Sequence, residues 1–317
     1  MTDGVKQTMP SVKFGLQLWP QSTSWPEVRD AAVAAEKAGW DSIWTWDHLL
    51  AIQGPWQQPI YEGWTFLAGL ASLTSRVRLG LMVGANTFRN PGLTTKLATT
   101  LDHVSNGRAV LGIGGAWFDR EHEAFGIEFG NSPGERLDWL GESVPLMRRL
   151  LDGELVTRQG RFYSFTDALC EPRPIQEHLP ILIGGSGPKK TLPIVARYGD
   201  AWNTSGPIKD VKVSLDLLAG YCADVGRDLA DIELTVSFPT IIRDRLADAK
   251  VARARQLAHN GLEDLGGVPM LTGSPASIAK AIKPYLALGF STVIVRMPAP
   301  FDRETIDRLP EVLALLG

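Results

Sequence analysis

The sequence predicts an α/β fold in the form of a single (β/α)8 TIM barrel. Short apolar segments alternate with longer segments that carry one apolar face, a pattern typical of parallel strands joined by helices. Eight of the short segments can be distinguished within 317 residues. At this length a closed barrel holds all eight in one sheet, and an open doubly wound sheet is the alternative.

The first half of the chain alternates regularly. Strands are expected at residues 12–18, 42–46, 77–83 and 109–113, and helices are expected to begin near residues 25, 62, 91 and 133. Ser24 and Glu27 form a capping box before the first helix, Gly39 follows its last turn, and Asn90 caps the third helix. The buried face of that third helix is expected to consist of Leu93, Leu97, Leu101 and Val104.

Two insertions interrupt the second half. One follows the fourth βα unit, where residues 155–165 predict a hairpin that turns at Gln159-Gly160. Strands are then expected at residues 181–184, 201–203, 232–238 and 291–296. A charged helical segment near residues 243–259 forms the second insertion, before the last strand, and Asp302 caps the last helix. We expect residues 1–317 to form one domain, with residues 1–10 disordered.

Composition limits the possible partners. Apolar residues make up 44% of the chain and charged residues 21%, as in ordinary soluble globular proteins. The net charge of −3 and the lack of a Lys/Arg block argue against nucleic acid or an anionic membrane as the partner. Two cysteines are too few for a disulfide framework, which fits a reducing compartment. With neither a signal peptide nor a membrane-spanning apolar run, a cytoplasmic location is expected.

A glycine-rich loop follows the strand at residues 181–184. It consists of small residues: Gly184, Gly185, Ser186 and Gly187. Pro188 is expected at the first position of the next helix, with Lys189, Lys190 and Thr191 in its first turn. Exposed amides at a helix start bind anions, so the loop predicts a site for a phosphate-bearing cofactor. The spacing matches neither a P-loop nor a Rossmann fingerprint, and a tight turn without a ligand is the alternative.

In a barrel, functional residues lie where the strands end. The residues expected there are mostly aromatic, small or neutral: Gln17, Trp19, Trp46, Asp47, His48, Val83, Gly84, Ala85, Asn86, Gly114, Gly115, Ala116, Trp117, Thr204, Ser205, Gly206 and Arg296, together with the glycine-rich loop. Small residues leave room for a flat ring, which Trp46 and Trp117 could enclose. His48 is the one histidine among them, and histidine is the residue type suited to proton transfer in the physiological pH range, although this side chain could instead cap the end of its strand.

Several kinds of chemistry lack their residues at this rim. It has no metal-binding cluster of histidines and carboxylates, no lysine at a strand end for a Schiff base, and no G-x-S-x-G nucleophile motif. We therefore expect no metal site. The chemistry is assigned to a bound organic cofactor, with the protein supplying one proton-transfer group.

Several long motifs resemble the luciferase-like monooxygenase superfamily. They are WTWDHL at residues 44–49, LGLMVGANTFRNP at 79–91, LDHVSNGRAVLGIGGAWFDREHEAFG at 101–126 and PILIGGSGPKKTLPIVARYGDAWN at 180–203. The hairpin followed by CEPRP belongs to the same pattern. Within the superfamily, the chain resembles most the group that depends on the deazaflavin coenzyme F-420. The resemblance covers nearly the whole chain and is loose over residues 207–290.

The resemblance implies a barrel that is usually dimeric, and it implies roles for particular residues. The position matching His48 acts as acid or base beside the deazaflavin ring. The position matching Val83 lies at a β-bulge, after a cis peptide bond from Met82, and supports the ring. Cofactor contacts are implied for Asp47, Met82, Val83, Gly84, Asn86, Gly115, Ala116, Gly184, Gly185, Ser186 and Gly187. The substrate pocket is expected to include Trp19, Trp46 and Trp117.

The chain departs from the family's sugar-phosphate dehydrogenases at two positions. A catalytic glutamate stands there at the position of Trp117, and a lysine that binds the substrate phosphate stands at the position of Pro207. A fairly apolar small molecule is therefore expected as the substrate. The favoured function is hydride transfer between coenzyme F-420 and this substrate, with His48 as acid or base. The alternatives are an FMN-dependent monooxygenase and a flavin-binding protein without turnover.

Overall fold

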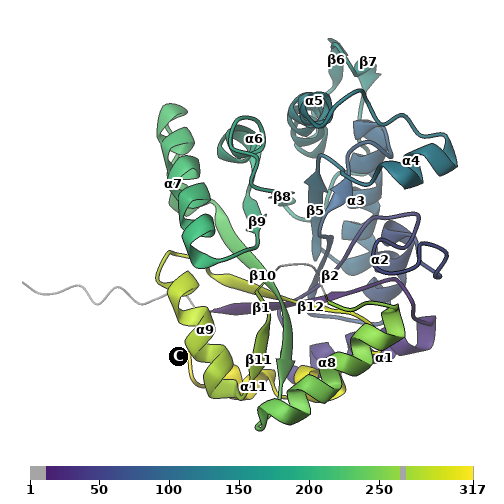
Figure 1. The fold of residues 1–317 in the computed structure, drawn as a ribbon. Coiled ribbons are helices and arrows are strands. Elements are labelled where there is room, and N and C mark those ends of the chain that lie inside the picture. The colour runs from purple at the N-terminus through teal and green to yellow at the C-terminus, as the bar shows by residue number, and fades with distance from the viewer. Residues whose placement is uncertain (1–11, 265–268, 317) are drawn as a thin grey trace, which may run out of the picture.

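Eight parallel strands close into a barrel in the computed structural model, which describes residues 12–264 and 269–316 (Figure 1). In cyclic order they are β12 (Thr292–Met297), β1 (Lys13–Leu18), β2 (Ser42–Thr45), β3 (Arg78–Leu81), β5 (Ala109–Gly114), β8 (Ile181–Gly184), β9 (Ala201–Thr204) and β10 (Glu233–Ile242). Pairing of β9 with β10 closes the sheet. The predicted fold class is confirmed, and the expectation for residues 1–10 lies outside the described residues.

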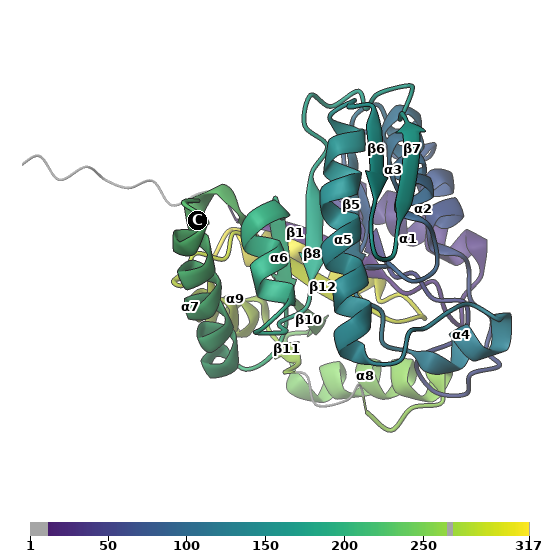
Figure 2. The ribbon, with the colours of Figure 1, turned by 90° about the horizontal axis from the view of Figure 1, so that it is seen from above.

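Both insertions lie outside the barrel. The first contains the hairpin of β6 (Val156–Gln159) and β7 (Ser164–Ala168), which lies beside α5 (Pro133–Leu151) in Figure 2. Val156 and Phe165 of the hairpin are buried together with Leu146 and Leu150 of α5. The second insertion contains α8 (Leu246–Asn260) and a short strand, β11 (Leu271–Gly273), which pairs with the end of β10. The sequence analysis did not predict β11.

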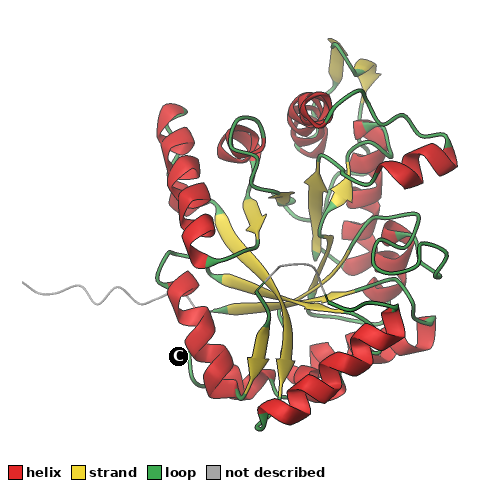
Figure 3. Cartoon of the chain, viewed as in Figure 1, coloured by secondary structure: helices red, strands yellow, loops and turns green. Residues whose placement is uncertain are grey.

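Helices surround the strands (Figure 3). They are α1 (Trp25–Ala38), α2 (Gly63–Ala71), α3 (Pro91–Ser105), α4 (Asp119–Phe125), α5, α6 (Thr191–Tyr198), α7 (Ile208–Asp224), α8, α9 (Pro275–Leu286), α10 (Arg303–Asp307) and α11 (Leu309–Leu313). The capping box of Ser24 and Glu27 is confirmed, as is the cap at Asn90, whose side chain accepts from the Gly92 amide. None of the helices in the described part of the chain is long and apolar enough to cross a membrane.

The buried face of α3 differs from the expected one. Leu93 and Val104 are exposed, whereas Thr94, Thr95 and Ala98 are buried. The threonines tolerate burial because their hydroxyls bond to the helix itself, as Thr95 Oγ1 does to the Pro91 carbonyl at 2.8 Å. The prediction failed because it counted only large apolar residues as core, although small polar ones can pack tightly against a barrel.

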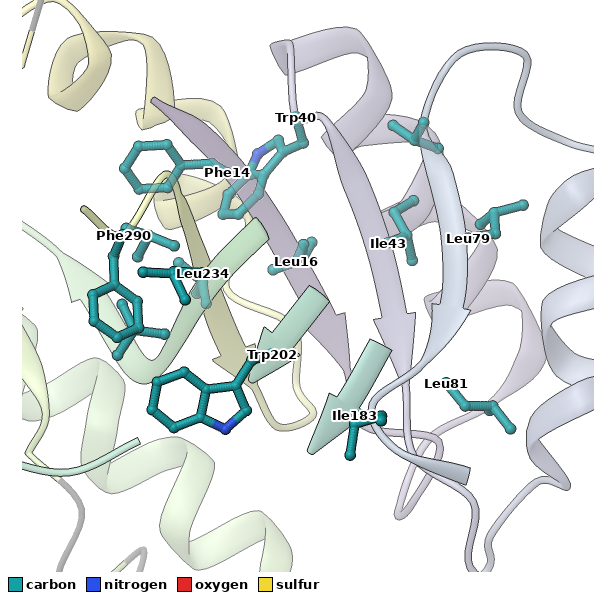
Figure 4. Close-up of a cluster of buried hydrophobic side chains, with 14 of the residues drawn as sticks. Phe14, Leu16, Trp40, Ile43, Leu79, Leu81, Ile183, Trp202, Leu234 and Phe290 are labelled. Carbon is teal, nitrogen blue, oxygen red and sulfur yellow. The ribbon is translucent and has the colours of Figure 1, made fainter. Parts of the chain in front are cut away.

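Alternate residues of each strand point to opposite faces of the barrel sheet. The larger cluster lies between strands and helices and includes Leu16, Ile43, Leu79 and Trp202 (Figure 4). A smaller cluster, centred on Trp44, includes Met82, Val110, Leu182, Ala201 and Ile294. A Cβ atom on Gly15 would lie 2.7 Å from Trp44 Nε1, so the glycine makes room for this indole. We infer that Trp44 is core rather than part of the site.

Asp102 joins three segments of the fold from a fully buried position at the end of α3. Its Oδ1 accepts from the Ala109 amide of β5 at 3.3 Å and from Gln176 Nε2 at 2.6 Å. Its Oδ2 accepts from the backbone amides of Ile175 and Gln176 at 2.8 and 3.0 Å. Removing the carboxylate would leave the buried Ala109 amide and the partly buried donors of residues 175 and 176 without an acceptor, which costs more than an ordinary hydrogen bond contributes.

Asp102→Ala is therefore expected to lower the free energy of unfolding by about 3 kcal/mol. Urea denaturation followed by circular dichroism measures the change. Asp216→Ala is the matched control, because Asp216 is exposed and pairs with Lys212 on the same helix. The control is expected to change stability by at most about 0.5 kcal/mol. Equal effects of the two substitutions would contradict the assigned role of Asp102.

Candidate active site

A pocket of about 560 Å³ opens at the carboxyl ends of the barrel strands. Every one of the eight strands contributes to its lining, either directly or through the residues that follow it. The pocket brings together nearly all of the expected site residues: Trp19, Trp46, Asp47, His48, Met82, Val83, Gly84, Gly115, Ala116, Trp117, Gly184, Gly185, Ser186 and Gly187. Their individual roles stay predictions. Their common location in one pocket is a feature of the structure.

Asn86 is not among the lining residues. Its buried side chain points to the first insertion, where Oδ1 accepts from Ser143 Oγ at 2.5 Å. Its Nδ2 donates to the Tyr163 hydroxyl at 3.3 Å, and burial raises the pKa of Tyr163 to about 12. In this structure Asn86 therefore attaches the rim of the barrel to α5 and the hairpin. The sequence analysis had placed its side chain in the pocket instead.

The third strand is broken where the pocket begins. β3 ends at Leu81, and β4 (Gly84–Ala85) resumes pairing with β5. The peptide bond between Met82 and Val83 is cis, which confirms the prediction drawn from the resemblance. The Met82 carbonyl accepts from Gln17 Nε2 of β1 at 2.8 Å. This bond ties the broken strand to β1, which lies two strands away in the sheet.

The side chain of Val83 packs between two glycines of neighbouring strands. A Cβ atom on Gly114 would lie 2.7 Å from Val83 Cγ2, and one on Gly184 would lie 2.8 Å from Val83 Cγ1. Real Cβ contacts are longer, so each glycine leaves space that Val83 fills. Val83 therefore forms an apolar surface of the pocket at the junction of β4, β5 and β8.

Asp47, which lines the pocket, supports the resumed strand. Its carboxylate is 1% exposed, and Oδ2 accepts from the Ala85 amide at 3.0 Å. Arg89 donates to both carboxylate oxygens, at 2.6 and 3.0 Å, and also to Glu62 at 2.8 Å. Burial opposes the charge of Arg89, yet the attraction of Asp47 and Glu62 raises its pKa above the ordinary value. The sequence analysis did not identify Arg89 as part of this site.

His48 is held by a buried carboxylate that the sequence analysis missed. His48 Nδ1 lies 2.8 Å from Glu121 Oε1 on α4, and Glu121 Oε2 accepts from the Leu49 amide at 2.8 Å. A carboxylate accepts the proton of Nδ1, which makes Nε2 the nitrogen that can exchange a proton with a ligand. The signal available in the sequence was the position of Glu121, a carboxylate four residues after Trp117 in the segment that follows the fourth expected strand.

Aromatic side chains surround His48. Trp46, Trp117 and Phe118 contact it edge to face, with ring centroids 6.1, 5.7 and 6.2 Å away. Trp19 packs on Trp46 at 4.6 Å. Trp117 is 59% exposed, so it lies at the rim, whereas Trp19 and Trp46 are buried. The histidine thus lies in a part of the pocket that is lined mainly by aromatic rings.

The glycine-rich loop is fixed by β9 and precedes a helix that begins later than expected. The Gly185 amide donates to the Asn203 carbonyl at 3.1 Å, and Trp202 Nε1 donates to the Gly185 carbonyl at 2.8 Å. Gly185 has a φ of +114°, which side chains disfavour. Residues 188–190 form a turn, and α6 begins at Thr191. Pro188 is therefore not the first helical residue.

The start of α6 retains features of an anion site. No side chain caps its first amide groups, and Thr191 lines the pocket. Lys190 is less available to bind an anion than the sequence indicated, because its ammonium group pairs with Asp138 and donates to the Gly134 carbonyl at 2.9 Å. Lys189 is exposed and is not among the lining residues. Backbone amides and a hydroxyl would thus carry most of the binding of a phosphate here.

Several polar atoms of the lining are buried and have no partner. Among the described residues, these include the Trp19 and Trp46 Nε1 atoms, Gln17 Oε1, and Nε and Nη2 of Arg296. Buried polar groups are normally hydrogen-bonded, so these atoms suit a ligand with polar edges. In the same part of the chain, residues 12–264 and 269–316, no three His, Cys, Asp or Glu side chains gather as a metal site would require.

The fold and the site together define a (β/α)8-barrel protein with a ligand pocket at the C-terminal mouth. The sequence pattern of the family described as luciferase-like monooxygenase matches residues 11–268. The F420-dependent glucose-6-phosphate dehydrogenase of Nakamurella multipartita is 30% identical over 346 residues, covering 98% of this chain and 99% of that protein. The chain therefore belongs to the luciferase-like monooxygenase family, as its motifs implied.

Other relatives show how far the similarity extends. An uncharacterised protein of Mycobacterium tuberculosis is 33% identical over 167 residues, and this match spans 53% of the chain but only 58% of that protein. The phthiodiolone/phenolphthiodiolone dimycocerosates ketoreductase of Mycobacterium bovis is 30% identical over 303 residues, covering 88% of this chain and 75% of that protein.

Solved structures share the fold at lower identity. An F420-dependent secondary alcohol dehydrogenase, in complex with an F420-acetone adduct, superposes with a TM-score of 0.84 at 19% identity, covering 97% of this chain and 99% of that chain. The coenzyme F420-dependent tetrahydromethanopterin reductase of Methanopyrus kandleri has a TM-score of 0.80 at 20% identity, covering 97% and 100%. At these identities the comparison establishes the barrel and not the reaction.

Gly184→Ala tests the packing of Val83. The added methyl group would overlap Val83, so the free energy of unfolding is expected to fall by about 2 kcal/mol. Val83→Ala in the same chain removes the overlapping methyls, so the double variant is expected to lose less stability than the sum of the two single variants. Urea denaturation of all four proteins measures this coupling.

Gly220→Ala is the control, because nothing lies within 4 Å of the Cβ it would add. This substitution in α7 is expected to leave stability unchanged or to raise it by about 0.5 kcal/mol. Additive losses in the Val83 and Gly184 variants would show that the two residues do not constrain each other.

Proposed function

We propose that the protein is an oxidoreductase that transfers hydride between coenzyme F-420 and a small organic substrate, with His48 as acid or base. Membership of the luciferase-like family and the F420-dependent relatives support an oxidoreductase or monooxygenase. The same relatives support coenzyme F-420 as the cofactor, with FMN as the alternative. The homodimer and the cytoplasmic location stay predictions of the sequence.

The residues of the pocket fit a flat ring with a phosphate-bearing tail. Val83 offers an apolar support, and glycines on both sides of it keep the surface open to a planar group. The loop at Gly185 and the uncapped start of α6 would hold the phosphate. When bound, the deazaflavin supplies a ring carbon that accepts or donates hydride.

The observation that supports this function best is the pairing of His48 with Glu121. The carboxylate fixes the orientation of the imidazole and stabilises it when a proton arrives. In the direction of reduction, Nε2 gives a proton to the oxygen of a substrate carbonyl group whose carbon receives the hydride. In the direction of oxidation, Nε2 removes the proton of an alcohol whose carbon loses the hydride. The surrounding aromatic rings limit water, which would compete for the proton.

Replacing the histidine tests this role. His48→Ala is expected to lower turnover by roughly 10²- to 10⁴-fold, the usual contribution of a general acid or base. The affinity for the cofactor is expected to change by no more than a few-fold, because the phosphate loop is untouched. Steady-state kinetics on a substrate found by screening, together with cofactor titration, measures both. Wild-type turnover in the variant would exclude His48 as the proton carrier.

Glu121→Gln tests the carboxylate as a positioning residue. It is expected to lower kcat by roughly 10- to 100-fold and leave KM and cofactor affinity nearly unchanged. Glu121→Asp keeps the charge and is expected to recover part of kcat. Glu123→Gln is the matched control, because Glu123 lies exposed on the same helix and should retain wild-type kinetics. A rise in KM with unchanged kcat would assign Glu121 a purely structural role.

The choice of cofactor is decided by titration of the purified protein with coenzyme F-420, FMN and riboflavin, followed by ring fluorescence. Coenzyme F-420 is expected to bind most tightly. Riboflavin is expected to bind more weakly than FMN, because it lacks the phosphate that the loop would hold. Tighter binding of FMN than of F-420 would favour the monooxygenase alternative, and equal affinities for FMN and riboflavin would contradict the phosphate site.

A further inference from the structure

Arg296 is a cation in the pocket lining without a counter-ion. It lies near the end of β12, opposite Gln17 of β1 and Pro239 of β10 in the strand register. Its Nε and Nη2 atoms are enclosed by the protein and donate to no acceptor. No ion pair involving Arg296 is found within residues 12–264 and 269–316. A guanidinium in such a position is unusual, because buried charges are normally paired.

The two buried carboxylates near the pocket are engaged elsewhere. Asp47 binds Arg89 through both oxygens, and Glu121 binds His48 and the Leu49 amide. Burial lowers the pKa of Arg296 to about 10, so the group is still a cation at neutral pH. An anion placed beside it would offset the cost of this burial. Residues 12–264 and 269–316 supply none, so the complement is expected to come from a ligand.

The strand order places Arg296 with the residues proposed for substrate chemistry. Apart from Asp47, the residues proposed to hold the cofactor follow or belong to β3, β4, β5 and β8, which are neighbours in the sheet. Arg296, Trp19 and His48 belong to or follow β12, β1 and β2, which are neighbours in the sheet. β12 and β1 lie across the barrel from β5 and β8. Neighbouring strands lie about 4.8 Å apart, so the backbones of β12 and β2 are separated by roughly 10 Å.

We propose that Arg296 binds the carboxylate of an organic acid substrate whose reacting carbon lies beside His48. The identity of the reacting group rests on the proposed function, whereas the anion site rests on Arg296 itself. A guanidinium matches the planar shape and charge of a carboxylate. The Nε1 atoms of Trp19 and Trp46 add two further donors to the same part of the pocket, and their rings would pack on the apolar body. This proposal refines the substrate expected from the sequence: it is an apolar molecule that carries a carboxylate at one end.

Two probes that differ mainly in charge test the proposal. They are 4-oxo-4-phenylbutanoate and its primary amide, each of which carries a ketone and an aromatic ring. Binding is measured by quenching of tryptophan fluorescence, first in the apoprotein and then with saturating coenzyme F-420. The wild type is expected to bind the acid at least tenfold more tightly than the amide. No preference for the acid in either state would overturn the proposal, whatever the variants do.

Variants locate the preference within the pocket. Arg296→Met is expected to weaken binding of the acid at least tenfold and to leave binding of the amide within about threefold, while Arg296→Lys is expected to retain part of the preference. Arg245→Met, which removes an exposed arginine, is the control for overall charge and should keep the preference. Loss of coenzyme F-420 binding in Arg296→Met, with acid binding unchanged, would assign Arg296 to the cofactor and overturn the proposal.

The outcomes separate this inference from the proposed function. A preference for the acid that depends on Arg296, in a protein that binds neither F-420 nor FMN, would support the anion site and overturn the redox function. Tight cofactor binding without any preference for the acid would overturn the anion site alone. Circular dichroism of each variant establishes that it is folded before the titrations are compared.

Discussion

The packing of Val83 between Gly114 and Gly184 is the contact on which the architecture of the site depends. It joins β4, β5 and β8 at the level where the barrel core ends and the pocket begins. A side chain on either glycine would displace the valine, and the valine would in turn reshape the pocket floor. Below this level Trp44 belongs to a buried cluster. Ligands therefore have room at the carboxyl ends of the strands.

Buried carboxylates fix the loops around the Val83 contact through hydrogen bonds and ion pairs. Asp47 connects the end of β2 to the amide of Ala85 and to Arg89, so the segment after the broken strand is fixed from two directions. Glu121 performs a similar task for His48 and the backbone after it. Both carboxylates are almost fully buried and have partners for their oxygens, which makes such groups costly to disturb. The two networks position the pocket without filling it.

The comparisons and the structure answer different questions. Family membership rests on a sequence pattern that matches residues 11–268, which include the pocket floor and the glycine-rich loop. Arg296 lies outside the matched residues, near the end of the barrel. A shared barrel at about 20% identity tolerates many substrates, because the chemistry depends on a few side chains at the strand ends. We therefore expect substrate choice to depend on residues such as Trp117 and Arg296.

The sequence by itself determined the eight strands, most of the helices and the list of residues at the strand ends. These features follow from periodicity and capping, which depend on residues close together in the chain. Trp44 could likewise be assigned to the core from its position within a strand. The cis bond after Met82 was implied by resemblance and not by local chemistry.

Only the tertiary structure decided which groups have partners. Glu121 lies 73 residues from His48, and nothing local to either residue indicates that they meet. The same holds for the diversion of Lys190 to Asp138 and for the later start of α6. Arg296 appeared in the sequence as one rim residue among many. That no counter-ion for it lies within residues 12–264 and 269–316 became visible only in the folded chain, because pairing depends on distance in space and not along the chain.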